Sequence, residues 1–538
     1  MISTPELLVL LPIIIVAVSV LAARLLIPPA VLLVIAGVAL ALIPGLPTVR
    51  LAPQLVLLFV LPPVIYSSAV AMSWREFRFS LRPISLLATG GVLFTTISTA
   101  AAAHWLLGLP WSGGFVLGAI VSPPDAVAPL AIARRMQIPR RILVILEGEG
   151  LANDATALVL YRFAVVAVSV GAFSFGHALA DFAAIVLGEL LWGLAVGWAM
   201  LRVRRWVDDP RLEIMLSVLT PFIAYWPPEH LGGSGVLATV TAGLYISWNG
   251  LRLISPETRL QGIFFWDFFI YLTEGMVFLI TGLQARALAD GFTAYSKTAL
   301  AVAAAVICAV IIAARFVWVY PATYLPRWLS STVAREDPAP PWQWAFAISF
   351  TGIRGIVSLA AALAIPLVTA SDEPFPYRDL ILVLTFAVIL VTLVGQGLLL
   401  PAVIRALHLT DAGRMEQEAE RAQELAARRK AIEAAMRHLD ALTAERSLPA
   451  EVVRRLQTRL GDRLTYVALK DSEDEMKRRT SAVYDDVEQS MLAAERDAVN
   501  ELYRKGRLRD EPRRRMEREF DLRHAYLSNL PMRSSSLE

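Results

Sequence analysis

The sequence contains a single cysteine, Cys308, among 538 residues. One cysteine excludes an intramolecular disulfide framework and any zinc site that depends on several cysteines, and because Cys308 lies in an apolar run we expect it only to pack. The nucleotide-binding P-loop, the G-x-S-x-G nucleophile elbow, the H-E-x-x-H zinc motif and the Rossmann fingerprint are also missing. We therefore predict that the chain is not an enzyme and holds no cofactor, so that its energy comes from an ion gradient.

Charged residues are scarce as well, at 18%, whereas 56% of the residues are apolar and the mean hydropathy is +0.56. This composition predicts an all-α polytopic membrane protein rather than a soluble multidomain protein. The charges are uneven, because residues 1–410 contain 24 Lys or Arg and 21 Asp or Glu, while residues 411–538 contain 26 of each. We therefore expect a membrane domain, 1–410, followed by a charged helical domain, 411–538.

Apolar segments of about the ~20 residues needed to cross ~30 Å of hydrocarbon recur along the membrane domain. Thirteen spans are predicted, near residues 5–26, 30–45, 53–72, 82–106, 112–133, 142–172, 178–203, 212–227, 232–248, 261–283, 295–320, 342–366 and 379–407. The first segment lacks the basic region and cleavage site of a signal peptide, so we interpret it as a span.

The basic residues between these segments alternate in number from one side to the other. With the N-terminus outside, the inner loops contain sixteen Lys or Arg and the outer loops contain four. This asymmetry follows the positive-inside rule. We therefore expect an outer N-terminus, a cytoplasmic C-terminal domain and a location in the plasma (inner) membrane, and we attribute the basic pI to membrane orientation rather than to nucleic-acid binding.

Two predicted spans are interrupted. The fifth contains Ser122-Pro123-Pro124-Asp125, where consecutive prolines remove backbone donors, and the twelfth contains an arginine between two glycines, Gly352-Ile353-Arg354-Gly355. If the first six spans are repeated in inverted form by the last six, these breaks occupy corresponding positions. Paired broken helices indicate a transporter site near the middle of the bilayer.

The stretch 145–162 places Glu147, Glu149, Asn153 and Asp154 within an apolar helix. Asp154 lies about twelve residues, or ~18 Å, into the sixth span, close to mid-membrane. Carboxylates at this depth indicate an ion or proton pathway. Asp125 follows the double proline, where freed carbonyls such as that of Pro124 add oxygen ligands, so Asp125 and Asp154 are the first candidates for cation contact. The alternative is that these acids are structural partners of arginines.

Three arginines within the spans are available to balance the acids, namely Arg162, Arg315 and Arg354. Buried arginine needs a partner because its charge is not lost by titration. For Glu149 and Arg315 we favour a structural ion pair, and Arg354 is placed to compensate the ends of the broken helices. Among further acids in apolar segments, Glu274 is the most central.

Five stretches resemble the sodium/proton exchangers of the electroneutral branch of the cation:proton antiporter superfamily. They are Glu147-Gly148-Glu149-Gly150-Leu151-Ala152-Asn153-Asp154, Leu61-Pro62-Pro63, Ser122-Pro123-Pro124-Asp125-Ala126-Val127-Ala128, Ala314-Arg315-Phe316-Val317 and Gly352-Ile353-Arg354-Gly355-Ile356-Val357-Ser358-Leu359. They occur in the family's order over residues 1 to about 410.

The resemblance implies thirteen helices in two inverted six-helix repeats, with a dimerisation domain and a core ion-translocation domain, and a homodimer. On the family's pattern Asp154 is the ion and proton carrier, Asn153 holds the neighbouring broken helix, Asp125 belongs to the site and Glu149 pairs with Arg315. Relatives with Asp-Asp in place of Asn-Asp tend to be electrogenic, so Asn153 implies exchange of one proton per cation.

Three positions depart from the family's pattern. Where some relatives have T-D-P, this chain has Pro124-Asp125-Ala126. Ser67 stands where many relatives have Glu. Gly150 stands in place of the usual Ser after the second Glu of the motif. Three oxygen ligands are thus altered together, and Glu274 is a candidate substitute.

We therefore predict a secondary antiporter in the lipid bilayer that exchanges a monovalent cation for H+. Na+ is expected first, with K+ and Li+ as alternatives, in pH and cation homeostasis. A cation channel, or an ion or pH sensor that signals through residues 411–538, are the alternative functions.

Overall fold

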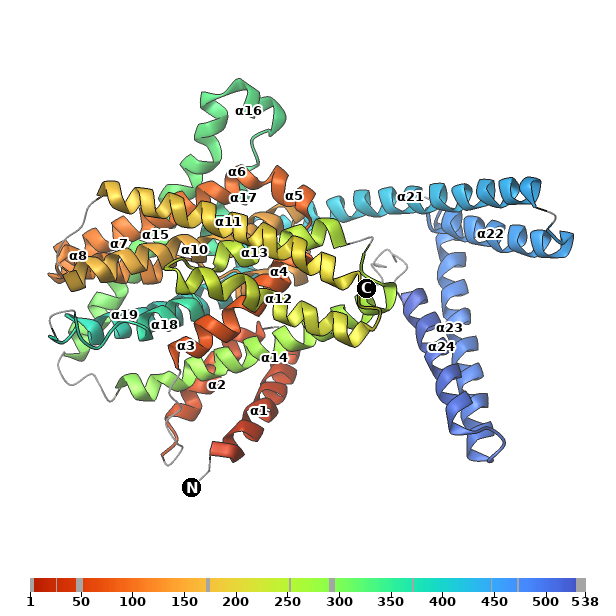
Figure 1. The fold of residues 1–538 in the computed structure, drawn as a ribbon, viewed down its shortest axis with the longest axis horizontal. Helices are drawn as coiled ribbons and strands as arrows, with labels where there is room; N and C mark the ends of the chain where they lie inside the picture. Colours follow the sequence, from red (N-terminus) through yellow and green to blue (C-terminus); the bar gives the residue numbers. More distant parts are fainter. Residues whose placement is uncertain are drawn as a thin grey trace. The chain divides into compact units, whose positions relative to one another are not determined.

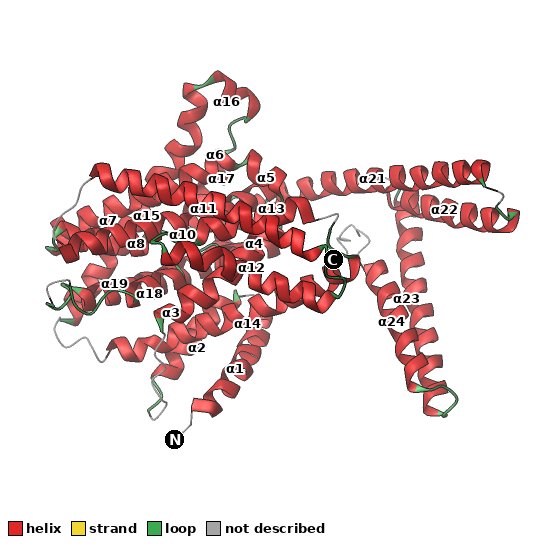
Figure 2. Ribbon diagram, in the orientation of Figure 1, coloured by secondary structure: helices red, strands yellow, loops and turns green. Residues whose placement is uncertain are grey.

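The structure is a computed structural model that describes residues 4–25, 27–44, 52–170, 175–250, 253–289, 296–369, 372–446, 448–471 and 474–528. These residues form helices, with one isolated β-bridge between Val368 and Pro374 (Figures 1 and 2). The chain divides into two compact units, Met1–Ala412 and Gly413–Glu538.

The first unit contains twenty α-helices among its described residues, and three of them continue through a π-helical turn. They are α1 (Thr4–Leu25), α2 (Pro29–Ala41), α3 (Pro53–Leu55), α4 (Leu61–Ala71), α5 (Trp74–Phe79), α6 (Leu81–Ser85), α7 (Val92–Leu107), α8 (Trp111–Val121), α9 (Val127–Arg135), α10 (Arg140–Val170), α11 (Phe175–Arg204), α12 (Pro210–His230), α13 (Val236–Asn249), α14 (Pro256–Ala289), α15 (Lys297–Leu329), α16 (Ser331–Glu336), α17 (Trp342–Phe350), α18 (Ile356–Leu363), α19 (Arg378–Leu390) and α20 (Gly397–Ala406). The π-helical turns Val56–Val60, Leu86–Gly91 and Val391–Gln396 join α3 to α4, α6 to α7 and α19 to α20.

Each of the thirteen predicted spans contains one or more of these helices. Seven continuous helical segments in the described residues are long and apolar enough to cross a membrane, and three shorter apolar helices lie at Leu10–Leu25, Pro29–Ala41 and Trp111–Val121. The number of spans and the two inverted repeats stay predictions.

The two interrupted segments are broken at the predicted places. α8 ends at Val121 and α9 begins at Val127, while α17 ends at Phe350 and α18 begins at Ile356. The breaks lie against each other, because the backbone N–H of Asp125 donates to the carbonyl of Ile353 at 2.7 Å. Their free backbone groups are thereby brought to one place.

Glycines let several helices pack at close range. A Cβ atom at Gly37 of α2 would lie 2.3 Å from the carbonyl oxygen of Leu279 and 2.8 Å from the Cα of Gly282, both on α14. Only small residues allow backbones to approach so closely within a bundle. α2 and α14 therefore pack as a tight pair.

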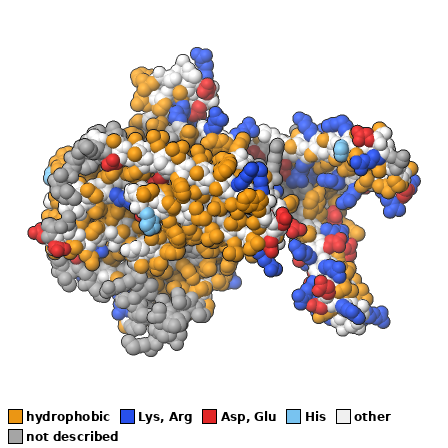
Figure 3. Space-filling model, viewed as in Figure 1, with side chains coloured by type: hydrophobic (Ala, Val, Ile, Leu, Met, Phe, Trp, Pro, Cys, Tyr) orange, Lys and Arg blue, Asp and Glu red, His pale blue; other side chains and the backbone are white. Residues whose placement is uncertain are grey.

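Large apolar side chains cover much of the described surface of the first unit. Figure 3 shows them in orange, and they include the exposed Trp198, Phe264 and Phe268. A continuous apolar surface on a bundle whose backbone groups are satisfied within helices is suited to contact with lipid.

The second unit consists of amphipathic helices. The helix α21 (Leu409–Glu445) leads into it, followed by α22 (Ala450–Asp471), α23 (Glu475–Arg504) and α24 (Asp510–Ser528). Small apolar clusters hold these helices together, one around Leu425, Ile432 and Val467 and the other around Leu492 and Phe520. Its cytoplasmic location stays a prediction.

Candidate ion-binding site

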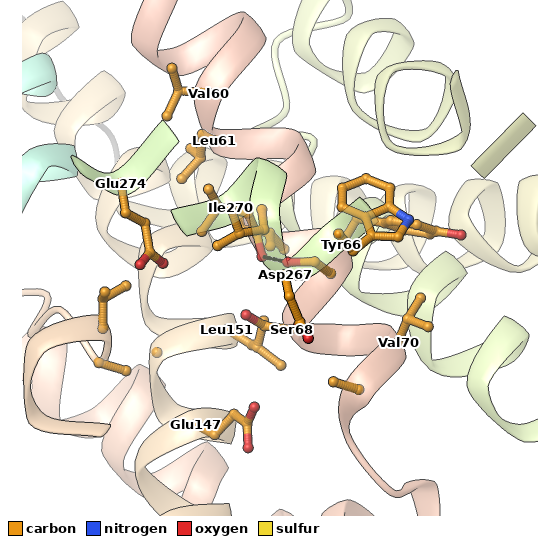
Figure 4. A pocket seen from close by; sticks show the side chains of 18 of the residues that line it. Val60, Leu61, Tyr66, Ser68, Val70, Glu147, Leu151, Asp267, Ile270 and Glu274 are labelled. Atoms are coloured by element: carbon orange, nitrogen blue, oxygen red, sulfur yellow. Dashed lines mark hydrogen bonds between the residues drawn. The ribbon is translucent and has the colours of Figure 1, made fainter. Parts of the chain in front are cut away.

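A cavity of about 870 Å³ enters the first unit and reaches both broken segments. Its walls come from α4, α10, α12, α14, α18 and the break between α8 and α9, and Figure 4 shows part of the lining. Most of the lining is apolar, and its charged members are Asp125, Arg134, Glu147, Asp154, Arg204, Glu213, Arg259, Asp267 and Glu274.

Helix α10 forms one wall of this cavity with a single face. Glu147, Gly150, Leu151 and Asp154 all line the cavity, at the spacing of three and four residues that defines one side of a helix. Glu149 is buried and does not line it. The acids of the 145–162 stretch therefore serve two different environments.

Glu149 lies in a bidentate ion pair with Arg315 of α15. Arg315 Nη1 lies 2.6 Å from Glu149 Oε1, and Nη2 lies 2.9 Å from Oε2. Arg315 Nε also donates to the carbonyl of Ile348 in α17 at 3.0 Å, and the two side chains are only 2% and 8% exposed. This geometry ties α10, α15 and the end of α17 together.

Asn153 connects α10 to the first break. Its Nδ2 donates to the carbonyl oxygen of Pro124 at 2.7 Å, so the side chain occupies a backbone acceptor that the interruption has freed. Its other amide atom, Oδ1, is buried and has no hydrogen-bond partner in the described part of the chain. Pro124 also lines the cavity, and its carbonyl keeps a second lone pair.

Asp125 is held at the entrance to α9. Its Oδ1 accepts from the backbone N–H of Val127 at 2.9 Å, while Oδ2 lies against Gly355 of the second break. A Cβ atom at position 355 would lie 1.8 Å from that oxygen, so only glycine leaves room for the carboxylate. The two breaks therefore fix Asp125 from both sides.

Asp154 differs from its neighbours in having no fixed partner. Among the described residues no hydrogen bond or ion pair engages its carboxylate, and it lies close enough to Asp125 for the two charges to repel. A buried carboxylate pair is stabilised when a cation or a proton neutralises it. This arrangement is chemically suited to the exchange of a bound cation for a proton.

Arg354 is buried, 1% exposed, between the ends of the two broken helices. Its Nε donates to the carbonyl of Val121 at 2.8 Å, Nη2 donates to that of Ser122 at 3.3 Å, and Nη1 donates to that of Gly352. These carbonyls end α8 and follow α17, where the helix dipoles are negative. The arginine therefore lies where its charge opposes the dipoles of two helix C-termini, and the compensating role predicted for it from the sequence stays a prediction.

Two of the departing positions have defined local contacts. A Cβ atom at Gly150 would lie 2.6 Å from the Cβ of Ala126, so α10 and the first break touch where relatives have a serine. Ser67 lines the cavity, but its hydroxyl donates to the carbonyl of Val64 within its own helix at 3.0 Å.

Other polar partners were not evident from the sequence. Glu147 pairs with Arg134 at 3.0 Å on the cavity wall. Arg162, for which the sequence indicated no particular acid, pairs with Glu229 of α12. Glu189 accepts from the backbone N–H groups of Ser234, Gly235 and Leu237. These partners lie far apart in the chain, so no local pattern reveals them.

The sequence model of one protein family, described as "Sodium/hydrogen exchanger, transmembrane", matches residues 9–406. An uncharacterised Na+/H+ exchanger of Mycobacterium tuberculosis is 34% identical over 513 residues, which covers 93% of this chain and 92% of the relative. A sodium, potassium, lithium and rubidium/H+ antiporter of Bacillus pumilus is 33% identical over 376 residues, covering 68% of this chain and 56% of the relative.

Solved structures agree on the fold. The sodium/proton antiporter MjNhaP1 from Methanocaldococcus jannaschii superposes with a TM-score of 0.56 at 18% identity, covering 74% of this chain and 98% of that protein. At this identity the likeness concerns the fold alone.

Proposed function

The chain belongs to the sodium/hydrogen exchanger family, and from this premise we propose that it exchanges Na+ for H+ across the plasma membrane with one proton per cation. K+ and Li+ are the alternative cations, and the relative from Bacillus pumilus is named for all three together with rubidium. The family relationship favours exchange over a channel or a sensor. The exchanger is a homodimer, with residues 411–538 on the cytoplasmic side.

The observation that carries this proposal is the unpartnered Asp154 in a cavity beside Asp125. In surroundings of low polarity an empty anionic site is costly to move across the membrane, whereas a site neutralised by Na+ or by a proton is not. Competition of the two ions for Asp154 is therefore sufficient for coupled exchange. Asp125 and the second lone pair of the Pro124 carbonyl add oxygen ligands for the cation.

Access to the site from one side at a time is supported by the position of a second ion pair. The cavity is lined by the N-terminal halves of α10 and α12, whereas Arg162 and Glu229 join these two helices near their C-terminal ends. We propose that this ion pair closes the far side while the cavity is open, and that it separates when the site turns to that side.

The stoichiometry rests on Asn153. Its amide engages the Pro124 carbonyl through a donor that an aspartate lacks. One ionisable carrier at positions 153 and 154 is consistent with exchange of one H+ for one cation, without net charge movement.

The test uses the purified protein in liposomes that contain a pH-sensitive dye, with NaCl, KCl or LiCl added outside. Wild-type protein should move protons upon addition of the transported cation, and clamping the membrane potential with valinomycin and K+ should leave the Na+-driven rate unchanged.

Asp154→Asn should lower the rate about 100-fold or more, which corresponds to ~2.7 kcal/mol. The exposed Asp379 gives the matched control Asp379→Asn, which should keep wild-type exchange. Equal rates for wild type and Asp154→Asn would refute the carrier assignment.

A further inference from the structure

Helix α14 forms a long wall of the cavity. Its lining residues recur every three or four positions from Thr258 to Phe278, so one face of the helix follows the cavity for about five turns. Two of these residues are acids, Asp267 and Glu274. They are seven residues apart, or about 10.5 Å along the helix, and therefore lie on the same face.

Glu274 is the more buried of the two acids. Asp267 is exposed, whereas Glu274 is half-buried and its carboxylate points into the cavity (Figure 4). Within the described residues it forms no hydrogen bond or ion pair, and it lies near enough to Asp125 for their charges to repel. A carboxylate at this depth is costly without a partner.

Three other glutamates of the same unit, which are buried or half-buried, have such partners. Glu149 is paired with Arg315, Glu229 with Arg162, and Glu189 accepts several backbone N–H groups at the start of α13. A structural role accounts for these three side chains. It does not account for Glu274, whose free carboxylate faces the same space as Asp125 and Asp154.

Glu274 lies on a different helix from the other two acids, although Phe278 and Leu279 of the same helix pack against Ala128 and Ile353 at the two breaks. α14 is packed against α2 through Gly37 and Gly282, and Gly275, next to Glu274, lies against Ile15 of α1. Asp154 lies on α10 and Asp125 in the first break. Glu274 therefore reaches the cavity from a different helix than Asp154 and Asp125.

The three acids are spread along the cavity. No group of three or more His, Cys, Asp or Glu side chains is close enough to hold a metal ion in the part of the chain that the structure describes. A cavity of about 870 Å³ has room for many waters, each of which takes ~30 Å³ in the liquid. The ion that meets Glu274 is thus a partly hydrated one.

We propose that Glu274 is the cation-capture residue of the cavity, which binds a partly hydrated monovalent cation on the α14 wall before the cation reaches Asp125 and Asp154. The proposal rests on the exchange function proposed above. In this role Glu274 contacts the cation before Asp125 and Asp154 do. Its loss should therefore weaken the affinity for the cation rather than lower the maximal rate.

The experiment measures dye-reported exchange in proteoliposomes as a function of Na+, K+ and Li+ concentration for wild type and three variants. Glu274→Gln should raise the KM for the transported cation about tenfold, equivalent to ~1.4 kcal/mol, and keep most of the maximal rate. Glu274→Asp, which retains the charge on a shorter side chain, should give an intermediate KM. Asp379→Asn is the control, because it removes an exposed acid that does not line the cavity, and it should stay within about twofold of wild type.

A second measurement follows cation binding without transport. Added Na+ should raise the thermal unfolding temperature of the detergent-solubilised wild type, because a ligand that binds only the folded state stabilises it. The Na+ concentration that gives half of this shift should rise in Glu274→Gln. Should Glu274→Gln not fold, Glu274→Asp is used in both measurements.

The outcomes separate this inference from the proposed function. If the wild type exchanges cations, Asp154→Asn does not, and Glu274→Gln has the wild-type KM for all three cations, Glu274 is not a capture residue while the exchange function stands. A change confined to the pH profile, with cation KM unaltered, overturns the capture role as well. If the wild type shows no exchange at all, the proposed function itself is wrong.

Discussion

Two regions that contact different faces of α10 differ in whether their charged side chains have partners. Behind the helix, Glu149, Arg315 and Arg354 are buried with named partners, and the space left among Glu149, Arg315 and their neighbours is only about 10 Å³. In front of it, Asp154 and Glu274 face a cavity of about 870 Å³ without fixed partners. We call the first region the paired layer. The comparison separates charges that hold the broken helices in place from charges left free for an ion.

Breaking the paired layer should have the largest effect on stability. Glu149→Gln leaves Arg315 buried without its counter-charge, a change that costs about 3–5 kcal/mol in comparable buried pairs. We expect a marked fall in the thermal unfolding temperature of the purified protein. Asp154→Asn, on the cavity side, should not lower it, because this carboxylate has no partner to lose. The double variant Glu149→Leu with Arg315→Met should recover part of the lost stability, because it removes both buried charges. Equal unfolding temperatures for Glu149→Gln and Asp154→Asn would contradict the distinction between paired and unpaired charges.

A second cluster of paired charges is centred on Asp337, which lies outside the spans, and its arginines lie near span ends. Its dependence on pH provides a further test of the comparison. Asp337 accepts from Arg82, from Arg141 at 2.5 Å and from Arg327 at 2.8 Å. Burial raises the pKa of Asp337, but the hydrogen bonds and charges of Arg141 and Arg327 outweigh it and hold this pKa below the usual 3.8.

Because the folded-state pKa is depressed, the stabilisation is present above pH ~4 and is lost as the pH falls through the folded-state pKa. Asp337→Asn should therefore lower stability by about 1.5–3 kcal/mol at neutral pH. The difference in unfolding free energy between Asp337→Asn and wild type should stay constant from pH 8 to pH ~5, and it should shrink only in stronger acid. Thermal unfolding over that range provides the measurement, and a difference that vanishes near neutrality would contradict the depressed pKa.

The smallest predicted effect concerns the cavity side. Gly355→Ala places a methyl group where Asp125 Oδ2 lies, so the carboxylate has to move away from the site. We expect exchange to fall about tenfold, or ~1.4 kcal/mol, with little change in folding. Gly188→Ala on α11 is the control, because a Cβ atom there meets no neighbour within 4 Å. Unchanged exchange in Gly355→Ala would indicate that the position of Asp125 is not critical.

Much of the fold was predictable because its signals are local. The double proline at Pro123 and Pro124 and the glycines around Arg354 interrupt the helical pattern within a few residues, and the structure breaks both helices there. Each predicted span contains a helix, since hydropathy over ~20 residues needs no partner to be recognised. The π-helical turns were not predicted, because a single residue's change of register leaves the apolar pattern nearly intact.

The site was predictable only in part, because it depends on which face of a helix meets which neighbour. The sequence groups Glu147, Glu149 and Asp154 together, yet one pairs with Arg134, one with Arg315 and one with no residue that the structure describes. Glu149 and Arg315 are 166 positions apart in the sequence, so only tertiary packing brings them together. The need of a buried arginine for a counter-charge suggested that pair and the family resemblance agreed with it, but neither supplied a partner for Arg162.

The contact between Gly150 and Ala126 also constrains how this chain can change. A serine at position 150 alone would overlap the Ala126 methyl group, so the substitution carries a steric penalty in this background. Ala126→Gly would remove this methyl group, so it should relieve the overlap. We therefore expect the effects of substitutions at positions 126 and 150 to be coupled rather than additive.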